Sequence, residues 1–221
     1  MPVSEIVTDT TLRISEIFLS LQGESTTVGL PTVFVRLTGC PLRCTYCDTA
    51  YAFSGGQRYA LSDIIEQVMQ YGVQHVTVTG GEPLAQKNCL ALLSNLCDQG
   101  LSVSLETSGA LPIAAVDQRV MVVMDLKTPS SNEVARNDWE NLPHLKPSDQ
   151  IKFVIGDEAD YLWAKAQIDQ HDLPARCAVL FSPSYEQLKA HILADWIVRD
   201  RLPVRFQIQL HKVLWGDLPG V

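Results

Sequence analysis

The sequence lacks long apolar runs, a surplus of basic residues and internal repeats, and each absence argues against a class of function. It contains no stretch of about 18 consecutive apolar residues, so no membrane-spanning helix is predicted. Residues 1–5 do not have the pattern of a signal peptide. The 17 Lys and Arg are outnumbered by 25 Asp and Glu, and the net charge of -8 argues against nucleic acid as the main partner. We therefore expect no membrane and no nucleic acid among the partners.

The composition is that of an ordinary globular chain, with 46% hydrophobic and 19% charged residues. A length of 221 residues suits one domain with a sizeable core, so a single domain over 1–221 is expected. Residues 1–13 are predicted to be a short leader with little to bury. Six cysteines without a secretory signal indicate a reducing cytoplasm, where clustered cysteines bind metal more often than they cross-link.

Three of the cysteines lie in one loop. Cys40, Cys44 and Cys47 have the spacing C-x3-C-x2-C and follow an apolar run. Gly39 and Pro41 favour the curl that would let three thiolates converge on one inorganic centre. A structural zinc site takes four protein ligands, and a fully protein-bound iron–sulfur cubane takes four cysteines. Three ligands would therefore leave one metal position open for chemistry.

The spacing of this loop is compatible with more than one kind of site. A zinc site could take a fourth ligand from Cys89, Cys97, Cys177 or a histidine, and the loop thiols could also be buried or include a disulfide. Cys89 and Cys97 lie two helical turns apart in a leucine-rich segment, and Cys177 enters an apolar run. All three are predicted to be core thiols, because free cysteine is among the most buried residue types. The spacing therefore favours an open-site iron–sulfur cluster over zinc.

Apolar segments of strand and helix type alternate along the rest of the chain, which is typical of parallel β/α units. A complete eight-fold barrel needs about 250 residues, so the sequence predicts an α/β fold with a partial, open, TIM-like barrel. The expected strands are 33–38, 75–79, 101–105, 120–124, 150–155 and 178–181, and the expected helices are 61–69 (capped by Ser62), 86–99, 159–170 and 185–199.

Polar residues collect directly after the predicted strands. They include Cys40, Thr79, 106–108, Lys127 and Ser182. The chemistry of a β/α barrel takes place at the carboxyl ends of its strands. Because the cysteine loop shares this rim, the sequence predicts one functional site there.

Two motifs resemble those of radical S-adenosylmethionine enzymes. The cysteine loop has an aromatic residue, Tyr46, before its last cysteine, and Gly80-Gly81-Glu82-Pro83 follows a later apolar run. The resemblance implies a radical S-adenosylmethionine fold in which Cys40, Cys44 and Cys47 hold a [4Fe–4S] cluster. It also implies that S-adenosylmethionine chelates the fourth iron and is cleaved reductively to a 5′-deoxyadenosyl radical.

A narrower resemblance runs from about Ile14 to the C-terminus and is to the 7-carboxy-7-deazaguanine synthase family. It is carried by segments 21–25, 47–49, 80–84 and 209–216. It implies a carbon–nitrogen lyase of queuosine and deazapurine biosynthesis, which contracts the ring of 6-carboxy-5,6,7,8-tetrahydropterin to 7-carboxy-7-deazaguanine with loss of ammonia. S-adenosylmethionine would be regenerated. The resemblance further implies Mg2+, a homodimer and an electron donor such as flavodoxin or ferredoxin.

The same resemblance implies roles for individual positions. Thr49 would bind Mg2+, whose shell the substrate and water complete. Gln22 and Glu24 would bind the amino-pyrimidinone edge of the pterin, and Arg36 would bind the carboxylate unless it forms a structural ion pair. The implied substrate contacts are Leu21, Gln22, Gly23, Glu24, Arg36 and Thr79. The implied S-adenosylmethionine contacts are Tyr46, Cys47, Asp48, Gly81, Ser108, Asp125, Leu126, Lys127, Phe181, Ser182, Pro183 and Ser184.

The C-terminal segment departs from part of the family. Some members end in a proline whose carboxylate helps to hold the substrate, but this chain continues through 215–221, so His211 or the new terminus is expected to substitute. Two alternative functions remain. A glycyl-radical activase would use the same cluster but admit a peptide loop. A non-catalytic zinc-binding module would need a fourth ligand outside the loop.

Overall fold

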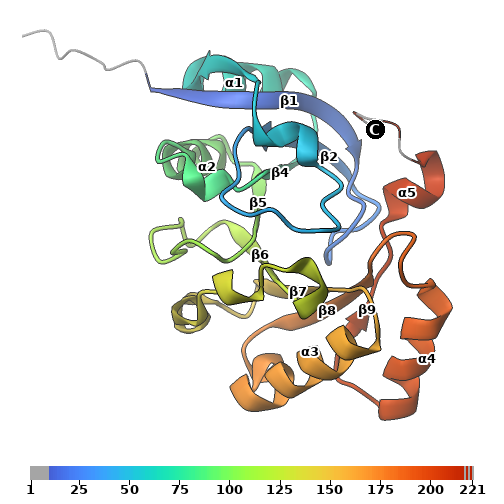
Figure 1. The fold of residues 1–221 in the computed structure, drawn as a ribbon. Helices are drawn as coiled ribbons and strands as arrows, with labels where there is room; N and C mark the ends of the chain where they lie inside the picture. The colour runs from blue at the N-terminus through green and yellow to red at the C-terminus, as the bar shows by residue number, and fades with distance from the viewer. Residues whose placement is uncertain (1–9, 217, 219, 221) are drawn as a thin grey trace, which may run out of the picture.

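The structure is a computed structural model that describes residues 10–216, 218 and 220 (Figure 1). Nine strands form one sheet in the order β3-β1-β2-β4-β5-β6-β7-β8-β9. From β2 through β9 the neighbouring strands are parallel, whereas β1 is antiparallel to both β2 and β3. The strands are β1 (Thr11–Leu21), β2 (Pro31–Leu37), β3 (Gln57–Ala60), β4 (His75–Gly80), β5 (Ser102–Thr107), β6 (Met121–Leu126), β7 (Gln150–Ile155), β8 (Ala178–Pro183) and β9 (Arg205–Phe206).

The sheet is curved and open, because β3 and β9 form its two edges and do not pair with each other. This confirms the predicted α/β fold with a partial, unclosed barrel. All six strands expected from the apolar runs are present, in the expected order. In β4 (HVTVTG) and β5 (SVSLET) apolar and polar residues alternate, so one face of these strands packs into the core and the other carries polar side chains.

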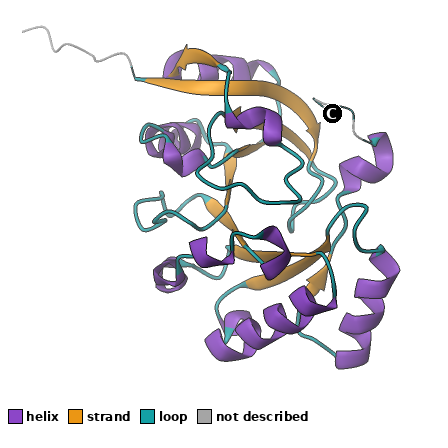
Figure 2. Ribbon diagram, in the orientation of Figure 1, coloured by secondary structure: helices purple, strands orange, loops and turns teal. Residues whose placement is uncertain are grey.

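Helices follow the outer side of the curved sheet (Figure 2). They are α1 (Leu61–Gln70) against β1 and β3, α2 (Cys89–Asp98) against β5, α3 (Glu158–His171) against β7, and α4 (Ala190–Asp200) against β8. A short α5 (Leu210–Trp215) follows β9. Within the described residues, no helix is long and apolar enough to cross a membrane. Short 3-10 helices are η1 (Ala50–Phe53), η2 (Pro83–Ala85), η3 (Pro129–Ser131), η4 (Val134–Arg136), η5 (Trp139–His144) and η6 (Leu173–Ala175).

The core lies between the sheet and these helices. Ile64 and Val68 of α1 are fully buried, as the one-sided apolar pattern of that helix predicts. Cys89, Cys97 and Cys177 also belong to the buried hydrophobic cluster, which confirms that they are core thiols. Burial raises the pKa of Cys89 to about 12, so this thiol is held in its neutral form.

The predicted leader, 1–13, extends too far, because its last three residues belong to the first strand. Strand β1 begins at Thr11, and Leu12 is 1% exposed and part of the core. Thr11 pairs with Ala60 of β3, about fifty residues later, so the order of this segment depends on a distant partner that local sequence does not reveal. The rest of the predicted leader, 1–9, lies outside the described residues.

The capping residue of α1 and the first residues of α2 and α4 differ from the prediction, although α1 begins at Leu61 as expected. Ser62 does not cap α1: Ala60 holds the N-cap position, and the Ser62 hydroxyl donates to Asp63. Helix α2 begins at Cys89 because the Gln86 side chain instead bonds the backbone of Arg13. Helix α4 begins at Ala190, after a turn over 185–189.

Candidate active site

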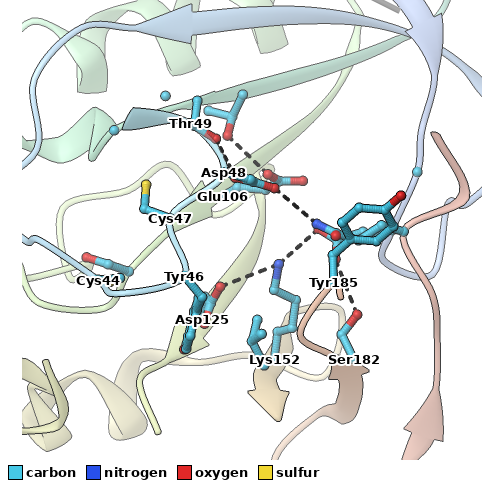
Figure 3. A pocket seen from close by; sticks show the side chains of 18 of the residues that line it. Cys44, Tyr46, Cys47, Asp48, Thr49, Glu106, Asp125, Lys152, Ser182 and Tyr185 are labelled. Atoms are coloured by element: carbon cyan, nitrogen blue, oxygen red, sulfur yellow. Dashed lines mark hydrogen bonds and ion pairs between the residues drawn. The ribbon is translucent and has the colours of Figure 1, made fainter. Parts of the chain in front are cut away.

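One cavity of about 640 Å³ opens at the carboxyl ends of the parallel strands (Figure 3). Each neighbouring strand contributes a polar side chain to its wall. These side chains are Arg36 from β2, Thr79 from β4, Glu106 from β5, Asp125 from β6, Lys152 from β7 and Ser182 from β8. The parallel topology thus gathers residues that are far apart in sequence, as predicted for this rim.

The cysteine loop forms one side of the cavity. Cys40, Cys44 and Cys47 all line it and are half-buried. Gly39 provides the predicted curl with a φ of 103°, a backbone conformation that favours glycine. Burial raises the pKa of the Cys44 thiol to about 11, so a bound metal would have to displace this proton.

This arrangement does not match a single-ion zinc site. Within residues 10–216, 218 and 220, no three His, Cys, Asp or Glu side chains converge closely enough to hold one metal ion. The proposed fourth ligands Cys89, Cys97 and Cys177 lie in the core, away from the cavity wall. The remaining donor set is three thiols on one cavity, which fits a larger cluster with one iron left for a ligand.

The segment Gly80-Gly81-Glu82-Pro83 packs against the cysteine loop. A Cβ atom at Gly81 would lie 2.4 Å from the Gly39 carbonyl oxygen and 2.7 Å from the Cys40 Cβ, so only glycine fits this contact. Glu82 is fully buried and accepts hydrogen bonds from the Ser108 backbone N–H at 2.7 Å and hydroxyl at 2.5 Å. Glu82 therefore fixes the rim of β4 to that of β5.

The loop after β6 supports the cysteine loop from the opposite side. Thr45 donates from its backbone N–H to the Ser131 carbonyl at 3.1 Å and from its hydroxyl to the Ser130 carbonyl at 2.5 Å. Ser130 is in turn held by the buried Asp160 of α3, which accepts from the Ser130 backbone N–H at 2.9 Å and from its hydroxyl. Asp160 also accepts from the Gly156 backbone N–H at 2.8 Å.

Opposite the cysteine loop lies a network of buried charges. Lys152 Nζ lies 2.9 Å from Glu24 Oε2 and 3.4 Å from Asp125 Oδ2. Burial lowers the pKa of Lys152, but the Glu24, Asp125 and Glu106 carboxylates outweigh this effect and raise it well above its usual value. Lys152 is therefore a permanent cation at the floor of the cavity, and Figure 3 shows it extending toward Asp125.

The predicted substrate residues all line this part of the cavity: Leu21, Gln22, Gly23, Glu24, Arg36 and Thr79. Arg36 was expected either to form a structural ion pair or to bind the substrate carboxylate. Its Nε donates to Glu16 Oε1 at 2.6 Å, and its side chain also lines the cavity. Gln22 uses its side chain locally, donating to the Thr77 hydroxyl at 2.9 Å. Thr79 donates to Glu106 Oε2 at 3.0 Å.

Most predicted S-adenosylmethionine residues also line the cavity: Tyr46, Cys47, Asp48, Gly81, Ser108, Asp125, Lys127, Ser182, Pro183 and Ser184. Leu126 and Phe181 do not, because their side chains are 0% exposed and belong to the hydrophobic core. The alternation of side chains along a strand turns these two residues away from their cavity-facing neighbours. Their side chains therefore do not reach the cavity, and an S-adenosylmethionine contact by Leu126 or Phe181 stays a prediction that only their backbone could fulfil.

Residues near the C-terminus close one side of the cavity. The Leu210 backbone N–H donates to the Gly23 carbonyl at 2.9 Å, and Gln209 Nε2 donates to Asp48 Oδ2 at 3.3 Å. His211 of α5 packs onto Gly23 so closely that a Cβ there would lie 2.2 Å from the His211 Nδ1. Burial lowers the pKa of His211 below its usual value despite the Glu24 and Asp48 carboxylates, so its imidazole is neutral at pH 7.

Sequence reasoning missed Lys152 and Gln209 as cavity residues. Lys152 carried a signal, since it is a lysine inside the otherwise apolar strand Gln150–Ile155. Gln209 belongs to the segment 209–216 that carries the family resemblance, but its approach to Asp48 joins positions 161 residues apart and could not be inferred from that segment.

Comparisons with known proteins agree with this geometry. The profile of the Radical SAM superfamily matches residues 34–138. A 7-carboxy-7-deazaguanine synthase of Chlorobaculum tepidum is 46% identical over 218 residues, which cover 97% of this chain and 99% of that protein. A 7-carboxy-7-deazaguanine synthase of Koribacter versatilis is 40% identical over 219 residues, covering 92% and 97%. The chain belongs to the 7-carboxy-7-deazaguanine synthase family.

A solved structure of QueE from Escherichia coli shares the fold of this family member. It superposes with a TM-score of 0.76 at 21% identity and covers 91% of this chain and 95% of that chain. A second solved structure, Streptococcus suis SuiB bound to its precursor peptide SuiA, gives a TM-score of 0.55 at 14% identity over 80% of this chain. The 7-carboxy-7-deazaguanine synthase family thus uses a radical S-adenosylmethionine fold here.

Proposed function

We propose that this enzyme converts 6-carboxy-5,6,7,8-tetrahydropterin to 7-carboxy-7-deazaguanine with loss of ammonia, by radical S-adenosylmethionine chemistry. One observation carries the proposal: the three-cysteine loop and the charged Glu24–Lys152 pair line the same cavity. A radical source and a polar binding surface for a small heterocycle are thereby brought together. We further propose that residues 1–221 act as one domain, in the cytoplasm, as a homodimer supplied with electrons by a flavodoxin or ferredoxin.

The residues of the cysteine loop suit a [4Fe–4S] cluster. Cys40, Cys44 and Cys47 would hold three irons and leave the fourth for a ligand in the cavity, and the close contact of Gly81 with Gly39 and Cys40 would support the loop. When bound, the cluster and S-adenosylmethionine supply the radical that removes hydrogen from the substrate. The chain itself positions both, with the Glu82–Ser108 bonds keeping the rim around them rigid.

The S-adenosylmethionine would lie between the cysteine loop and the carboxyl ends of β4 to β8. Polar groups at this edge can bind its amino, carboxylate and ribose groups. The candidates are Tyr46, Asp48, Ser108, Asp125, Lys127, Ser182 and Ser184. Lys127 and Asp125 form an ion pair at 3.2 Å, which gives this half of the cavity both a cation and an anion for a zwitterionic ligand.

The pterin would occupy the other half of the cavity. Glu24 presents a carboxylate that can accept two N–H donors from the amino-pyrimidinone edge. The Arg36 guanidinium uses Nε for Glu16 and so keeps its terminal nitrogens for the substrate carboxylate. The neutral His211 and the α5 segment would cover the bound ring and limit access of water.

We assign the Mg2+ site to Thr49. Its hydroxyl donates to Asp48 Oδ1 at 2.6 Å and lies on the cavity wall beside the cysteine loop. One neutral oxygen ligand is enough if a substrate carboxylate and waters complete the octahedron, since Mg2+ retains water readily.

The competing glycyl-radical activase would have to admit a peptide backbone. The wall of this cavity is instead occupied by charged and amide side chains, and Gln209 and His211 close it from the C-terminal side. These groups match a small charged heterocycle better than a peptide loop.

The test is an anaerobic turnover with reconstituted protein, S-adenosylmethionine, reductant, Mg2+ and 6-carboxytetrahydropterin, with products separated by mass. We expect 7-carboxy-7-deazaguanine to form with catalytic amounts of S-adenosylmethionine. Accumulation of 5′-deoxyadenosine without a deazapurine would contradict the substrate assignment but keep the radical chemistry. A colourless, zinc-containing product of reconstitution would contradict both.

A further inference from the structure

Lys152 is a cavity residue that the family resemblance leaves without a role. It lies on β7, in the middle of the core-forming strand, and is 9% exposed. Removing an ammonium group from water costs several kcal/mol unless it is well paired. An apolar residue would serve the packing of β7 better, so the cation has another use.

The groups around Lys152 indicate that use. Glu24 from the turn after β1, Asp125 from β6 and Glu106 from β5 all face the same cavity as its ammonium group. Asp125 and Lys152 are direct register partners on neighbouring strands, which fixes their separation. Without the lysine, three carboxylates would share one partly desolvated space, and at least one would take up a proton.

Glu24 depends most on this cation. The Glu24–Lys152 contact of 2.9 Å is shorter than the Asp125–Lys152 contact of 3.4 Å. The Glu24 backbone N–H donates to Gln22 Oε1 at 3.2 Å, and Ser182 Oγ lies 3.5 Å from Glu24 Oε1. The backbone of Glu24 is therefore fixed by its own turn, whereas the carboxylate is fixed mainly by Lys152.

We propose that Lys152 is a positioning residue that determines which heterocycle the site accepts, by holding the Glu24 carboxylate in an orientation that aims it into the cavity. This inference rests on the proposed pterin substrate. Its basis is hydrogen-bond chemistry: the amino-pyrimidinone edge presents N–H donors, and an ionised carboxylate offers only acceptors. A Glu24 side chain without its lysine partner would be free to turn away from those N–H donors.

The geometry leaves the required acceptors available. Lys152 occupies one of the two lone-pair directions on Glu24 Oε2, and the Ser182 hydroxyl approaches Oε1 only at the limit of a hydrogen bond. A carboxylate has about four lone-pair sites, so two parallel N–H bonds from a ligand remain possible. Lys152 therefore holds the Glu24 carboxylate without occupying the lone-pair sites that the substrate needs.

The experiment measures anaerobic binding of two ligands to cluster-loaded protein with S-adenosylmethionine present and reductant absent, so that no turnover occurs. One ligand is 6-carboxytetrahydropterin, and the other is its analogue with a carbonyl oxygen in place of the 2-amino group. The wild type is expected to prefer the 2-amino compound. Lys152→Met is expected to weaken pterin binding about 10- to 100-fold and to reduce this preference, as for loss of a charged hydrogen-bond partner.

A double-mutant cycle shows whether Lys152 acts through Glu24. Glu24→Gln alone is expected to lower the affinity for the pterin. Adding Lys152→Met to that variant should lower the affinity by no more than about twofold further. S-adenosylmethionine affinity should change less than pterin affinity, because Asp125 is the longer contact. Lys152→Arg, which keeps the charge, should restore part of the preference.

Lys146→Met is the matched control, since it removes a lysine that is paired with the buried Asp149 and does not line the cavity. It should leave both ligand affinities unchanged. If Lys152→Met does not fold, a folded Glu24→Gln/Lys152→Met variant with the affinity of Glu24→Gln still supports the proposal. A double variant that also fails to fold would overturn it, because Lys152 would then be a structural residue.

Two further results separate the proposals. If the wild type binds no pterin, the proposed function is wrong and this role of Lys152 is wrong with it. If the wild type binds the pterin but the Lys152→Met loss is as large in the Glu24→Gln background, only the role of Lys152 is overturned. A Lys152→Met variant that loses more affinity for S-adenosylmethionine than for the pterin would also overturn the proposed role of Lys152.

Discussion

The two halves of the cavity are built by different physical means. The cysteine loop is held by short-range backbone contacts: Thr45 bonds the loop after β6, and Gly81 packs on Gly39 and Cys40. The half proposed to bind the pterin is held by side-chain charges from separate segments, with Lys152 paired to Glu24 and also to Asp125, which belongs to the proposed S-adenosylmethionine half. Volume added between backbone segments forces the backbone to move, whereas side chains at a cavity wall can turn aside. The halves should therefore fail in different ways.

Gly81→Ala should have the largest effect and should damage the cluster half. The added methyl group would meet the Gly39 carbonyl oxygen at 2.4 Å, and this backbone cannot move without displacing Cys40. We expect most of the cluster to be lost and activity to fall by about two orders of magnitude or more, consistent with overpacking of about 1–3 kcal/mol. Iron and sulfide per chain, with visible absorption, give the measurement. A fully loaded Gly81→Ala protein would show that the close contact does not control the loop.

Asp160→Asn should have the next largest effect, through the support of the same loop. The asparagine amide would face the Ser130 and Gly156 backbone N–H groups with a donor in place of one acceptor. We expect a loss of about 1–3 kcal/mol in unfolding free energy. Release of iron to a chelator should also be several-fold faster, because Ser130 carries the bond to Thr45.

Asp169→Asn is the control for that substitution, since Asp169 is exposed on the same helix α3. It should change neither the unfolding free energy nor the rate of iron release. If Asp160→Asn lowers stability but releases iron at the wild-type rate, Asp160 supports the fold without positioning the cysteine loop.

Gly23→Ala is the counterpart of Gly81→Ala in the pterin half. Its methyl group would lie 2.2 Å from His211 Nδ1, the end of a side chain that can rotate away. We expect full cluster content and a pterin KM raised about tenfold, as α5 moves off the turn, at a cost near 1.4 kcal/mol. Cluster loss in Gly23→Ala comparable to that in Gly81→Ala would contradict the division of the cavity into two halves.

The same division explains how much the sequence could reveal. The cysteine loop and Gly80-Gly81-Glu82-Pro83 each follow a predicted strand, so the sequence placed both at one rim of the barrel. Their packing against each other through Gly81 and Gly39 was not predicted. The strand order and the open barrel were also predictable, because apolar runs and their alternation set them. These features are carried by short segments whose residue pattern can be recognised in the sequence.

The pterin half depends on pairs that are remote in sequence. Lys152 and Glu24 are 128 positions apart, and Gln209 reaches Asp48 from 161 positions away. Leu126 and Phe181 were named because the family resemblance implies them, and strand alternation turns their side chains into the core. Thr11 was assigned to a leader because its partner Ala60 lies on another strand. Such contacts are decided by tertiary packing.

Glu106→Gln should have the smallest effect of these substitutions. It replaces a carboxyl group by an amide of similar size, and we expect it to change the pH dependence of stability. Burial raises the pKa of Glu106 above its usual value near 4.5, and although Lys152 opposes this effect, the Glu24 carboxylate adds to it. Between the usual and the raised pKa, the folded chain holds a proton that the unfolded chain has released. The folded state then binds more protons, so its contribution to stability falls as pH rises through this window.

Glutamine cannot titrate, so Glu106→Gln should remove that part of the pH dependence. Urea unfolding of the cluster-free chain at a series of pH values gives the measurement. Compared with the variant, the wild type should lose stability as pH rises above about 4.5, by about 1.4 kcal/mol for each unit of upward pKa shift. The two proteins should then differ by a constant amount above the raised pKa. Parallel curves from acid to neutral pH would show that Lys152 compensates Glu106 completely, and the pterin half would then be balanced in charge without its ligand.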